Sequence, residues 1–497
     1  MADGPRADDA IPGATIALSL ISHTNAGKTT LARTLVGRDV GAVSDAQHVT
    51  QEAAVYTLLE TAGGEALLLW DTPGFGDSAR LARRLAQQHH PLGWFLSEVW
   101  DRFRDRAFHL AQQAVRNVAA DADVVLYLVN ATELPGDAGY LVPELDILEW
   151  IGKPVVVLVN QTGAPRPRDA EAAQEDAWRH AIGARPMVRA VATLDAFTRC
   201  WVQEIALLDL VGDALPESRR ALNARLAQAW QARRVVQFDT AMAILAAPIA
   251  AAACDREALA EGGAIDAWRD IGRRLGIAAD AASGRAAGAS RALASRLADA
   301  LRGATDRLVA LHELDGRAQR EVEARIAEGV SVDAPMSEGK AALMGGAVSG
   351  ALTGLAADIA TGGLSFGAGM LAGAILGALG GAGVARGMNL ARGKTGAVLR
   401  FDDAFLTGLV ASALLRYLTV AHYGRGRGEW SESEHPAFWT PLVTEIIEYH
   451  RDRLARIWSM RVPACEEAAL RDELQSLLRD AAWQTLDRLY PGTLPSR

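Results

Sequence analysis

Ser22-His23-Thr24-Asn25-Ala26-Gly27-Lys28-Thr29 follows directly on the apolar run 14–21 and decides the fold of the N-terminal part of the chain. The stretch fits the phosphate-binding pattern G-x-x-x-x-G-K-[ST] at every fixed position except the first, where Ser22 stands in place of glycine. In such a loop, backbone N–H groups and the start of the following helix surround the phosphates of a nucleotide. We therefore predict a strand over 14–21, a nucleotide-binding loop and a helix over 30–36.

The side chains of this loop have distinct expected tasks. Gly27 lets the backbone approach the phosphates, Lys28 reaches the β- and γ-phosphate oxygens, and the Thr29 hydroxyl is a ligand for Mg²⁺. The alternative is a glycine-containing turn between strand and helix that carries a surface lysine. The predicted phosphate-binding residues are Asn25, Ala26, Gly27, Lys28, Thr29 and Thr30.

A second motif, Trp70-Asp71-Thr72-Pro73-Gly74, stands at the end of the apolar run 66–70. An aspartate at this point binds Mg²⁺, usually through a water molecule, and the glycine amide senses the γ-phosphate. Between the two motifs, Thr50 in the polar loop 39–51 is our candidate for a metal ligand that closes only when the γ-phosphate is present. The alternative for Thr50 is a structural loop residue. The predicted metal ligands are thus Thr29, Thr50 and Asp71.

Short apolar runs alternate with longer amphipathic stretches from residue 14 to about residue 195. Several runs are almost entirely Val, Leu and Ile, as expected of parallel strands buried on both faces. The alternation predicts an α/β domain with a mostly parallel sheet, helices on both sides and a ligand at the carboxyl ends of the strands. The runs are 14–21, 53–59, 66–70, 124–129, 155–159 and 188–192.

We assign 1–13 to a flexible N-terminus and 14–200 to this α/β domain. Within the domain, the long segment 75–122 is rich in Arg, Gln, Trp and Phe. It predicts two or three amphipathic helices that replace a short switch region, the alternative being ordinary helices packed on the sheet.

The motifs S-H-T-N-A-G-K-T, H-V-T and W-D-T-P-G-F-G-D resemble the Era-like branch of the translation-factor-related GTPases. More narrowly, the chain resembles a bacterial group of such GTPases with a C-terminal domain of unknown function. The resemblance covers about residues 14–195. It implies a P-loop G domain, GTP and GDP as ligands, Mg²⁺ as cofactor, GTP hydrolysis and switching between two conformations.

One departure from Ras-type enzymes concerns catalysis. Phe75 follows the D-T-P-G motif where such enzymes carry the glutamine that positions the attacking water. In Era-like relatives with a hydrophobic residue there, an asparagine of the phosphate loop helps to hold K⁺, and Asn25 matches that position. The resemblance thus implies Lys28, Thr50 and Asn25 as catalytic residues and K⁺ as a further cation. The alternative is that Asn25 only hydrogen-bonds within the loop.

A second departure concerns the base. The guanine-recognition motif N-K-x-D corresponds to Asn160-Gln161-Thr162-Gly163, which keeps the asparagine but loses the lysine and the aspartate. The carboxylate that discriminates against adenine is therefore missing, and spacing gives no evidence that Asp169 replaces it. The last motif, usually S-A-[KL], aligns with residues 192–194, so Thr193 is the predicted backbone contact to the base.

The C-terminal part predicts mainly helices over 201–335 and 391–497, separated by a Gly- and Ala-rich segment over 336–390. Between residues 340 and 386 the only charged residue is Asp358, and glycines recur every four residues. The arms 341–357 and 359–385 are close to the length that crosses a hydrocarbon core of about 30 Å. We predict a Gly-rich apolar hairpin that associates with a membrane, the alternative being a tightly packed hairpin in water.

Composition limits the other classes of function. With 51 basic and 60 acidic residues, the net charge of −9 gives no strong nucleic-acid signal. Cys200, Cys254 and Cys465 are far apart in sequence, which favours a reducing compartment and argues against zinc and disulfides. The polar stretch 1–9 does not resemble a signal peptide, so we predict a cytoplasmic protein associated with the inner membrane.

These observations predict a Mg²⁺-dependent GTPase switch that hydrolyses GTP to GDP and phosphate and associates with a membrane through the hairpin. Its expected partners are guanine nucleotide, the membrane, and a protein effector or second copy that contacts the switch regions. Two alternatives stay open. One is a soluble Era-like GTPase in ribosome or RNA assembly, and the other is a nucleotide-binding scaffold with little catalysis.

Overall fold

The computed structural model of the chain describes residues 14–23, 26–37, 54–75, 77–87, 106–163, 165–258, 279–314, 388–393, 396–423, 436–461 and 464–495. The chain divides into two units. The first comprises residues 1–236, 421–430 and 489–497, and the second comprises 237–420 and 431–488.

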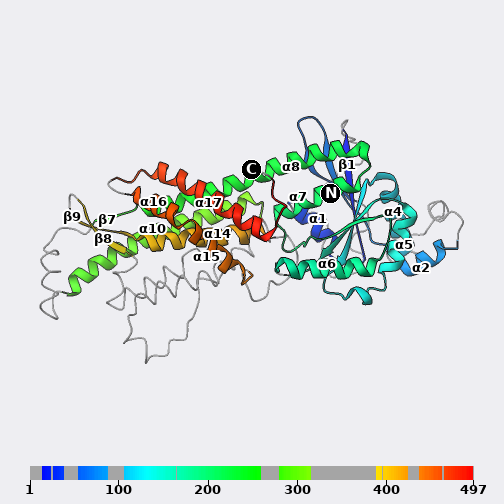
Figure 1. The fold of residues 1–497 in the computed structure, drawn as a ribbon, viewed down its shortest axis with the longest axis horizontal. Coiled ribbons are helices and arrows are strands. Elements are labelled where there is room, and N and C mark those ends of the chain that lie inside the picture. Colours follow the sequence, from blue (N-terminus) through cyan, green and yellow to red (C-terminus); the bar gives the residue numbers. More distant parts are fainter. Residues whose placement is uncertain are drawn as a thin grey trace, which may run out of the picture. The chain divides into compact units, whose positions relative to one another are not determined.

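The first unit is built on a six-stranded sheet with the order β2-β3-β1-β4-β5-β6. Only β2 runs antiparallel, against β3, and all other neighbours are parallel. The predicted α/β fold with a mostly parallel sheet is confirmed (Figure 1). The strands are β1 (Thr15–Ser22), β2 (Ala54–Glu60), β3 (Ala66–Asp71), β4 (Val124–Asn130), β5 (Val155–Asn160) and β6 (Val188–Thr193).

Helices cover both faces of this sheet, which explains why its central strands are apolar along their whole length. One face packs in a single buried cluster with α2, α4, α5 and α6, in which Phe75, Phe108, Tyr127 and Trp178 are the largest side chains. On the other face, α1 contacts β1, β2 and β3, and α7 contacts β5 and β6. The helices are α1 (Lys28–Val36), α2 (Ser78–Leu85), α4 (Arg106–Asp121), α5 (Leu141–Ile151), α6 (Arg168–Ile182) and α7 (Trp201–Ala214), with a 3-10 turn, η1, at Pro135–Asp137.

Parallel pairing brings the carboxyl ends of the strands to one edge of the sheet. Leu20 pairs with Asp71, Ser22 with Leu128, and Asn130 with Asn160. Both sequence motifs and the altered base motif therefore lie at this edge, as expected of an open α/β sheet.

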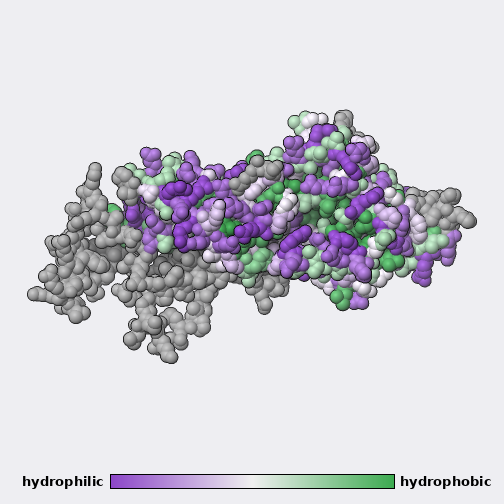
Figure 2. Space-filling view, viewed as in Figure 1, coloured by the Kyte–Doolittle hydropathy of each residue, from purple (hydrophilic) through white to green (hydrophobic). Residues whose placement is uncertain are grey.

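The second unit is mainly helical, as predicted, and its helices bury leucine and alanine at helical spacing. In α17 the buried side chains include Leu470, Leu474, Leu477 and Ala481, while the face of α16 and α17 seen in Figure 2 is largely hydrophilic. The helices are α8 (Glu217–Cys254), which begins in the first unit, α10 (Ala279–Leu311), α14 (Asp403–Ala421), α15 (Trp439–Tyr449), α16 (Arg451–Ser459) and α17 (Glu467–Leu489).

A small antiparallel sheet interrupts this helical part, which the sequence had not predicted. Its order is β7-β9-β8, with β7 at Glu257–Ala258, β8 at Met388–Gly393 and β9 at Gly396–Phe401. The expectation that strands end after residue 195 was therefore wrong. β7 has only two residues, and β8 and β9 carry arginine and glycine beside their apolar residues, so no long apolar run marks any of the three.

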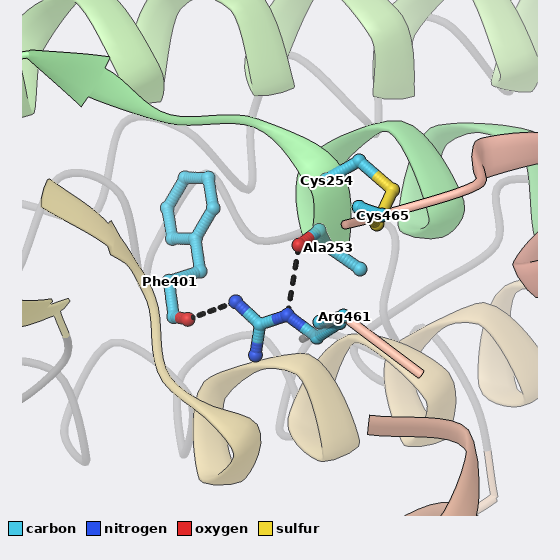
Figure 3. The surroundings of a disulfide bond; sticks show 5 residues. All are labelled: Ala253, Cys254, Phe401, Arg461 and Cys465. Atoms are coloured by element: carbon cyan, nitrogen blue, oxygen red, sulfur yellow. Dashed lines mark hydrogen bonds between the residues drawn. A yellow bond between two sulfur atoms is a disulfide. The ribbon is translucent and has the colours of Figure 1, made fainter. Parts of the chain in front are cut away.

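The expectation that the cysteines form no disulfide was also wrong. Cys254 and Cys465 are disulfide-bonded across 211 residues of sequence, with their Cα atoms 5.4 Å apart (Figure 3). Sequence spacing could not reveal the pair, because tertiary packing brings the end of α8 to the segment before α17. Cys200 is a free thiol, and burial raises the pKa of that thiol to about 12.

Two described helices, α8 and α14, are long and apolar enough to cross a membrane by length and composition. In α14 most of the apolar stretch is buried inside the protein, and it includes the fully buried Arg416. This burial is what a core helix of the second unit shows. The predicted hairpin at 341–385 lies outside the described residues.

Candidate nucleotide-binding site

The phosphate loop connects β1, which ends at Ser22, to α1, which begins at Lys28. Gly27 has a left-handed backbone with φ +84°, and a Cβ atom there would lie 2.6 Å from the Asn160 amide nitrogen. Gly74 is equally restricted, since its Cβ would lie 2.8 Å from the Ser22 carbonyl oxygen. Both motif glycines are therefore required by close approach of other parts of the site.

The two motifs meet at Asp71. The Lys28 ammonium forms an ion pair with Asp71 Oδ1, and the Thr29 hydroxyl donates a hydrogen bond of 2.8 Å to Asp71 Oδ2. Asp71 and Lys28 are both buried. The Thr72 hydroxyl donates to the Leu20 carbonyl (2.6 Å), which fixes the end of β3 beside β1.

The oxygens of Thr29 and Asp71 fit the ligand preference of Mg²⁺, a hard cation bound by hydroxyl, carboxylate and phosphate oxygens. Of the other predicted catalytic or metal-binding residues, Thr50 and Asn25 lie outside the described residues. Ala26 is buried near the end of the phosphate loop, and Thr30 is buried in the first turn of α1.

Phe75 belongs to the core and not to the site. Its side chain is 1% exposed and packs in the buried cluster with Leu81 and Phe108. It therefore holds the start of the segment after D-T-P-G against the sheet and offers no group that orients water.

The altered base motif is tied to the phosphate loop by Asn160. Its amide nitrogen donates to the Ala26 carbonyl (2.7 Å), and its amide oxygen accepts from the Ala196 N–H (2.8 Å). The next residue, Gln161, has φ +62°, and its amide nitrogen lies 3.1 Å from the position of a Cβ on Gly27. Asn160 and Gln161 thus both reach back to the loop that binds phosphate.

Asn160 is bonded to Ala196, which follows Asp195. Both residues lie after Thr193, the predicted backbone contact to the base. Thr193 is the last residue of β6, and its N–H donates to Glu175 of α6 (2.9 Å). Asp169, weighed as a replacement carboxylate, is exposed in the first turn of α6.

Sequence reasoning missed the Asp195 carboxylate. Its Oδ2 accepts hydrogen bonds from the Thr162 N–H, the Thr162 hydroxyl (2.8 Å) and the Gly163 N–H (3.2 Å), and its Oδ1 accepts from the Phe197 N–H (2.6 Å). Burial raises the pKa of Asp195, although these hydrogen bonds act in the opposite direction. The sequence signal was an acidic residue two positions after the end of the last strand.

Sequence reasoning also missed an ionisable group at the start of the loop. His23 Nδ1 lies 2.7 Å from Oε1 of Glu144, whose Oε2 accepts from the Tyr127 hydroxyl (2.8 Å). The His23 ring stacks on Tyr140 at 4.1 Å between centroids. Glu144 is completely buried, so this cluster anchors the first residues of the loop to α5 and β4.

Comparison with known proteins agrees with the phosphate loop and the D-T-P-G motif of the first unit. Residues 18–161 match the family described as 50S ribosome-binding GTPase, and residues 180–489 match the domain of unknown function DUF3482. The GTPase Era of Heliobacterium modesticaldum is 28% identical over 144 residues, which are 29% of this chain and 38% of that protein. The chain thus spans well under half the length of this curated relative.

Solved structures with similarity to the chain include two nucleotide-bound proteins. A variant of Era from Aquifex aeolicus with GDP and AlF4⁻ is 18% identical, with 41% of this chain and 58% of that chain covered and a TM-score of 0.31. GMPPNP-bound NFeoB from S. thermophilus is 18% identical, with 45% and 77% covered and a TM-score of 0.22. On the family matches, the chain belongs to the DUF3482 family, and in this chain the DUF3482 domain follows an Era-like P-loop GTPase domain.

Proposed function

We propose that this protein binds GTP together with Mg²⁺ and hydrolyses it to GDP and phosphate as a molecular switch. The observation that carries the proposal is the convergence of Lys28 and Thr29 on Asp71, which joins the phosphate loop to the D-T-P-G motif. With a nucleotide bound, Lys28 would turn its charge to the phosphate oxygens, and Thr29, Asp71 and Thr50 would hold the metal. Mg²⁺ would supply positive charge that offsets the negative charge of the phosphates.

Hydrolysis proceeds by in-line attack of water on the γ-phosphorus, with the bond to the bridging oxygen breaking. Because Phe75 is buried in the core, no side chain at that position orients the water. We therefore expect slow intrinsic turnover and assign Asn25 as the residue through which K⁺ accelerates it. The experiment is GTP hydrolysis by the full chain in KCl and in NaCl, with Asn25→Ala as the matched variant.

The switch runs through Gly74, which lies directly against Ser22 of the phosphate loop. A γ-phosphate at the loop attracts the Gly74 N–H, and the movement passes through the buried Phe75 into α2. An effector protein or a second copy of the chain would contact these switch regions.

Guanine is the expected base on the family resemblance. The decisive measurement is competition of GTP, GDP and ATP for the full chain. Preference for ATP would overturn the guanine assignment, and failure to bind any of the three would overturn the nucleotide function.

We also propose that residues 341–385 bring the protein to the inner membrane from the cytoplasm. The support is the sequence pattern of small residues with a single charge. Deletion of 341–385 should move the protein from the membrane to the soluble fraction while GTP binding is retained. Fractionation of both proteins tests this, and a full chain found only in the soluble fraction contradicts it.

The second candidate is a role on the ribosome, which the description of the matching GTPase family favours. Co-sedimentation with ribosomal subunits in the presence of GTP or GDP distinguishes it from membrane association. A third candidate is a scaffold with little catalysis, and tight GTP binding without turnover in either salt would favour it.

A further inference from the structure

Helix α1 joins the phosphate site at its first turn to a buried network near its last turn. The first turn carries Lys28 and Thr29. Near the other end, the Thr34 hydroxyl donates to the Ala196 carbonyl (2.8 Å), and the Thr34 carbonyl accepts from Arg199 (2.8 Å). Thr34 is fully buried. A displacement of α1 must therefore be followed by the segment after β6, or these buried hydrogen bonds break.

Arg199 links this end of α1 to helix α7. A second nitrogen of its guanidinium forms an ion pair with Oε1 of Glu204. The side chains of the pair are 13% and 2% exposed, so water and salt screen it little. A planar guanidinium can bond a carbonyl and a carboxylate at the same time. Arg199 thus ties α1 and α7 together through one side chain.

Glu204 extends the network from α7 to α8. Its Oε2 accepts hydrogen bonds from the Trp230 indole N–H (3.0 Å) and from the Arg234 guanidinium (2.8 Å). The same guanidinium lies over the Trp230 ring, 4.9 Å from its centroid. A single buried carboxylate is therefore shared between the side chain that bonds α1 and two side chains of α8. Loss of a partner on either side would leave a buried charge less compensated, which is costly.

The first half of α8 is also packed closely on α7. A Cβ atom on Gly212 would lie 2.8 Å from the amide nitrogen of Asn223, and that nitrogen donates to the Leu208 carbonyl (2.9 Å). Leu226 of α8 is completely buried. Both helices belong to the DUF3482 match, which begins at residue 180. The domain of unknown function thus supplies packed helices to the unit that carries the nucleotide site.

A bound nucleotide would act on the start of this network. Lys28 and Thr29 are its proposed ligands, and they lie about 9 Å or less from Thr34 along the helix axis, at about 1.5 Å per residue. Phosphates held by the first turn restrict the motion of α1. A restricted α1 keeps Arg199 and Glu204 in place, and these in turn hold the first half of α8.

We propose that Arg199 is the positioning residue through which bound nucleotide stabilises the packing of α8 in the first unit. This inference rests on the proposed function and adds a regulatory connection to it. The helix continues to Cys254, and its residues 237–254 belong to the second unit. The nucleotide would thereby affect the helix that both units share.

The test is hydrogen exchange of the α8 amides 219–236 in the full chain, with and without GDP and Mg²⁺. In the wild type, nucleotide should slow this exchange by about 5-fold or more, as a coupling of about 1 kcal/mol requires. Arg199→Lys keeps a charge beside Glu204, but its ammonium cannot span carbonyl and carboxylate as the guanidinium does. In this variant the slowing over α8 should fall below about 2-fold, while the α1 amides 28–36 remain protected by nucleotide.

Arg225→Lys is the matched control on the same stretch of α8. Arg225 pairs with Glu65 and its side chain is 56% exposed, so the change affects a surface contact and not the network. The effect of nucleotide on α8 should be that of the wild type. Glu204→Gln interrupts the network from the side of α7 and should abolish the effect as Arg199→Lys does. Nucleotide protection of α1 in the same sample verifies that each variant is folded and binds GDP.

Full slowing of α8 exchange by GDP in both Arg199→Lys and Glu204→Gln would overturn the inference. A wild type in which GDP protects α1 and leaves α8 unchanged would overturn it as well, and the network would then only stabilise the fold. A wild type that binds no GDP and shows no protection of either helix contradicts the proposed function itself. The two failures are thus distinguishable in one set of exchange measurements.

Discussion

The Thr29 hydroxyl lies 2.8 Å from the Asp71 carboxylate, although 42 residues separate the two along the chain. Parallel pairing of β1 with β3 brings them together, because it places the ends of both strands at one edge of the sheet. The same carboxylate pairs with Lys28, so a hydroxyl, a carboxylate and an ammonium group are gathered where phosphate and metal would bind.

Removing the ammonium group should abolish nucleotide binding. Lys28→Met deletes the hydrogen bonds to phosphate, each worth about 1.5–3 kcal/mol, so affinity for GTP and GDP should fall by about 100-fold or more. Asp71 keeps the Thr29 hydrogen bond. Titration with a fluorescent GDP analogue measures the loss, and circular dichroism verifies folding.

Lys153→Met is the control, since Lys153 bonds the Ala122 carbonyl and not the site. It should bind nucleotide like the wild type. Unchanged affinity in Lys28→Met would contradict the assignment of the loop.

Gly27→Ala should destabilise the first unit by about 2–3 kcal/mol. The left-handed backbone costs a non-glycine residue about 1–2 kcal/mol. The new methyl group also displaces the Asn160 amide, which loses its bond to Ala26, worth about 1 kcal/mol. Urea unfolding followed by tryptophan fluorescence gives the value.

Gly152→Ala separates the two contributions. Gly152 has φ +74°, and a Cβ there meets nothing within 4 Å. It should show the backbone cost alone and leave nucleotide affinity unchanged. Equal effects of the two substitutions would mean that the approach of Asn160 to Gly27 has no energetic consequence.

Glu144→Ala should destabilise the same unit by about 3–5 kcal/mol, because it leaves the buried Tyr127 hydroxyl and His23 without their acceptor. Burial already raises the pKa of Tyr127, so its hydroxyl cannot ionise to relieve the loss. Nucleotide affinity should fall as well, since His23 begins the phosphate loop.

Glu149→Ala on the same helix is the matched control. Glu149 is largely exposed and pairs with Arg185 at the surface, so the change should cost less than about 1 kcal/mol. Thermal unfolding of both variants compares them. A Glu144→Ala protein as stable as Glu149→Ala would show that the cluster does not hold the loop.

All six strands of the first unit could be predicted, because apolar runs bounded by polar residues identify strands directly. Lys28, Thr29 and Asp71 could be predicted as well, since their motif is local in sequence. Asp195, Glu144 and the Cys254–Cys465 pair could not, because each acts on residues brought close only by tertiary packing. The three short strands of the second unit were missed because none of them carries a long continuous apolar run.

Reduction of the disulfide should destabilise the second unit by about 2–5 kcal/mol, since the bond closes a loop across 211 residues of sequence. Urea unfolding with and without a dithiol reductant measures this, and free-thiol counting in the native protein verifies the bond. The double variant Cys254→Ser, Cys465→Ser should match the reduced wild type and show no response to reductant. A wild type that shows no response either would contradict the role of this bond.

Arg461 holds the same junction by hydrogen bonds. Its guanidinium donates to the carbonyls of Ala253 (2.8 Å) and Phe401 (2.6 Å), next to the disulfide (Figure 3). It also donates to Asp403 (2.7 Å). The side chain is almost fully buried, and burial lowers the pKa of Arg461. Arg461→Lys keeps a charge but cannot reach all three oxygens, so it should cost about 2–4 kcal/mol.

Arg302→Lys is the control for this change, because Arg302 is exposed on α10 and pairs with Asp299 one turn away. It should cost less than about 0.5 kcal/mol. Arg461 and the disulfide both fix the end of α8, so the effects of losing each should not add. When Cys254 and Cys465 are replaced by serine, Arg461→Lys should open the region that the disulfide otherwise keeps closed. Hydrogen exchange of residues 250–254 and 398–401 measures this opening. Purely additive exchange rates would mean that the two contacts stabilise the second unit independently.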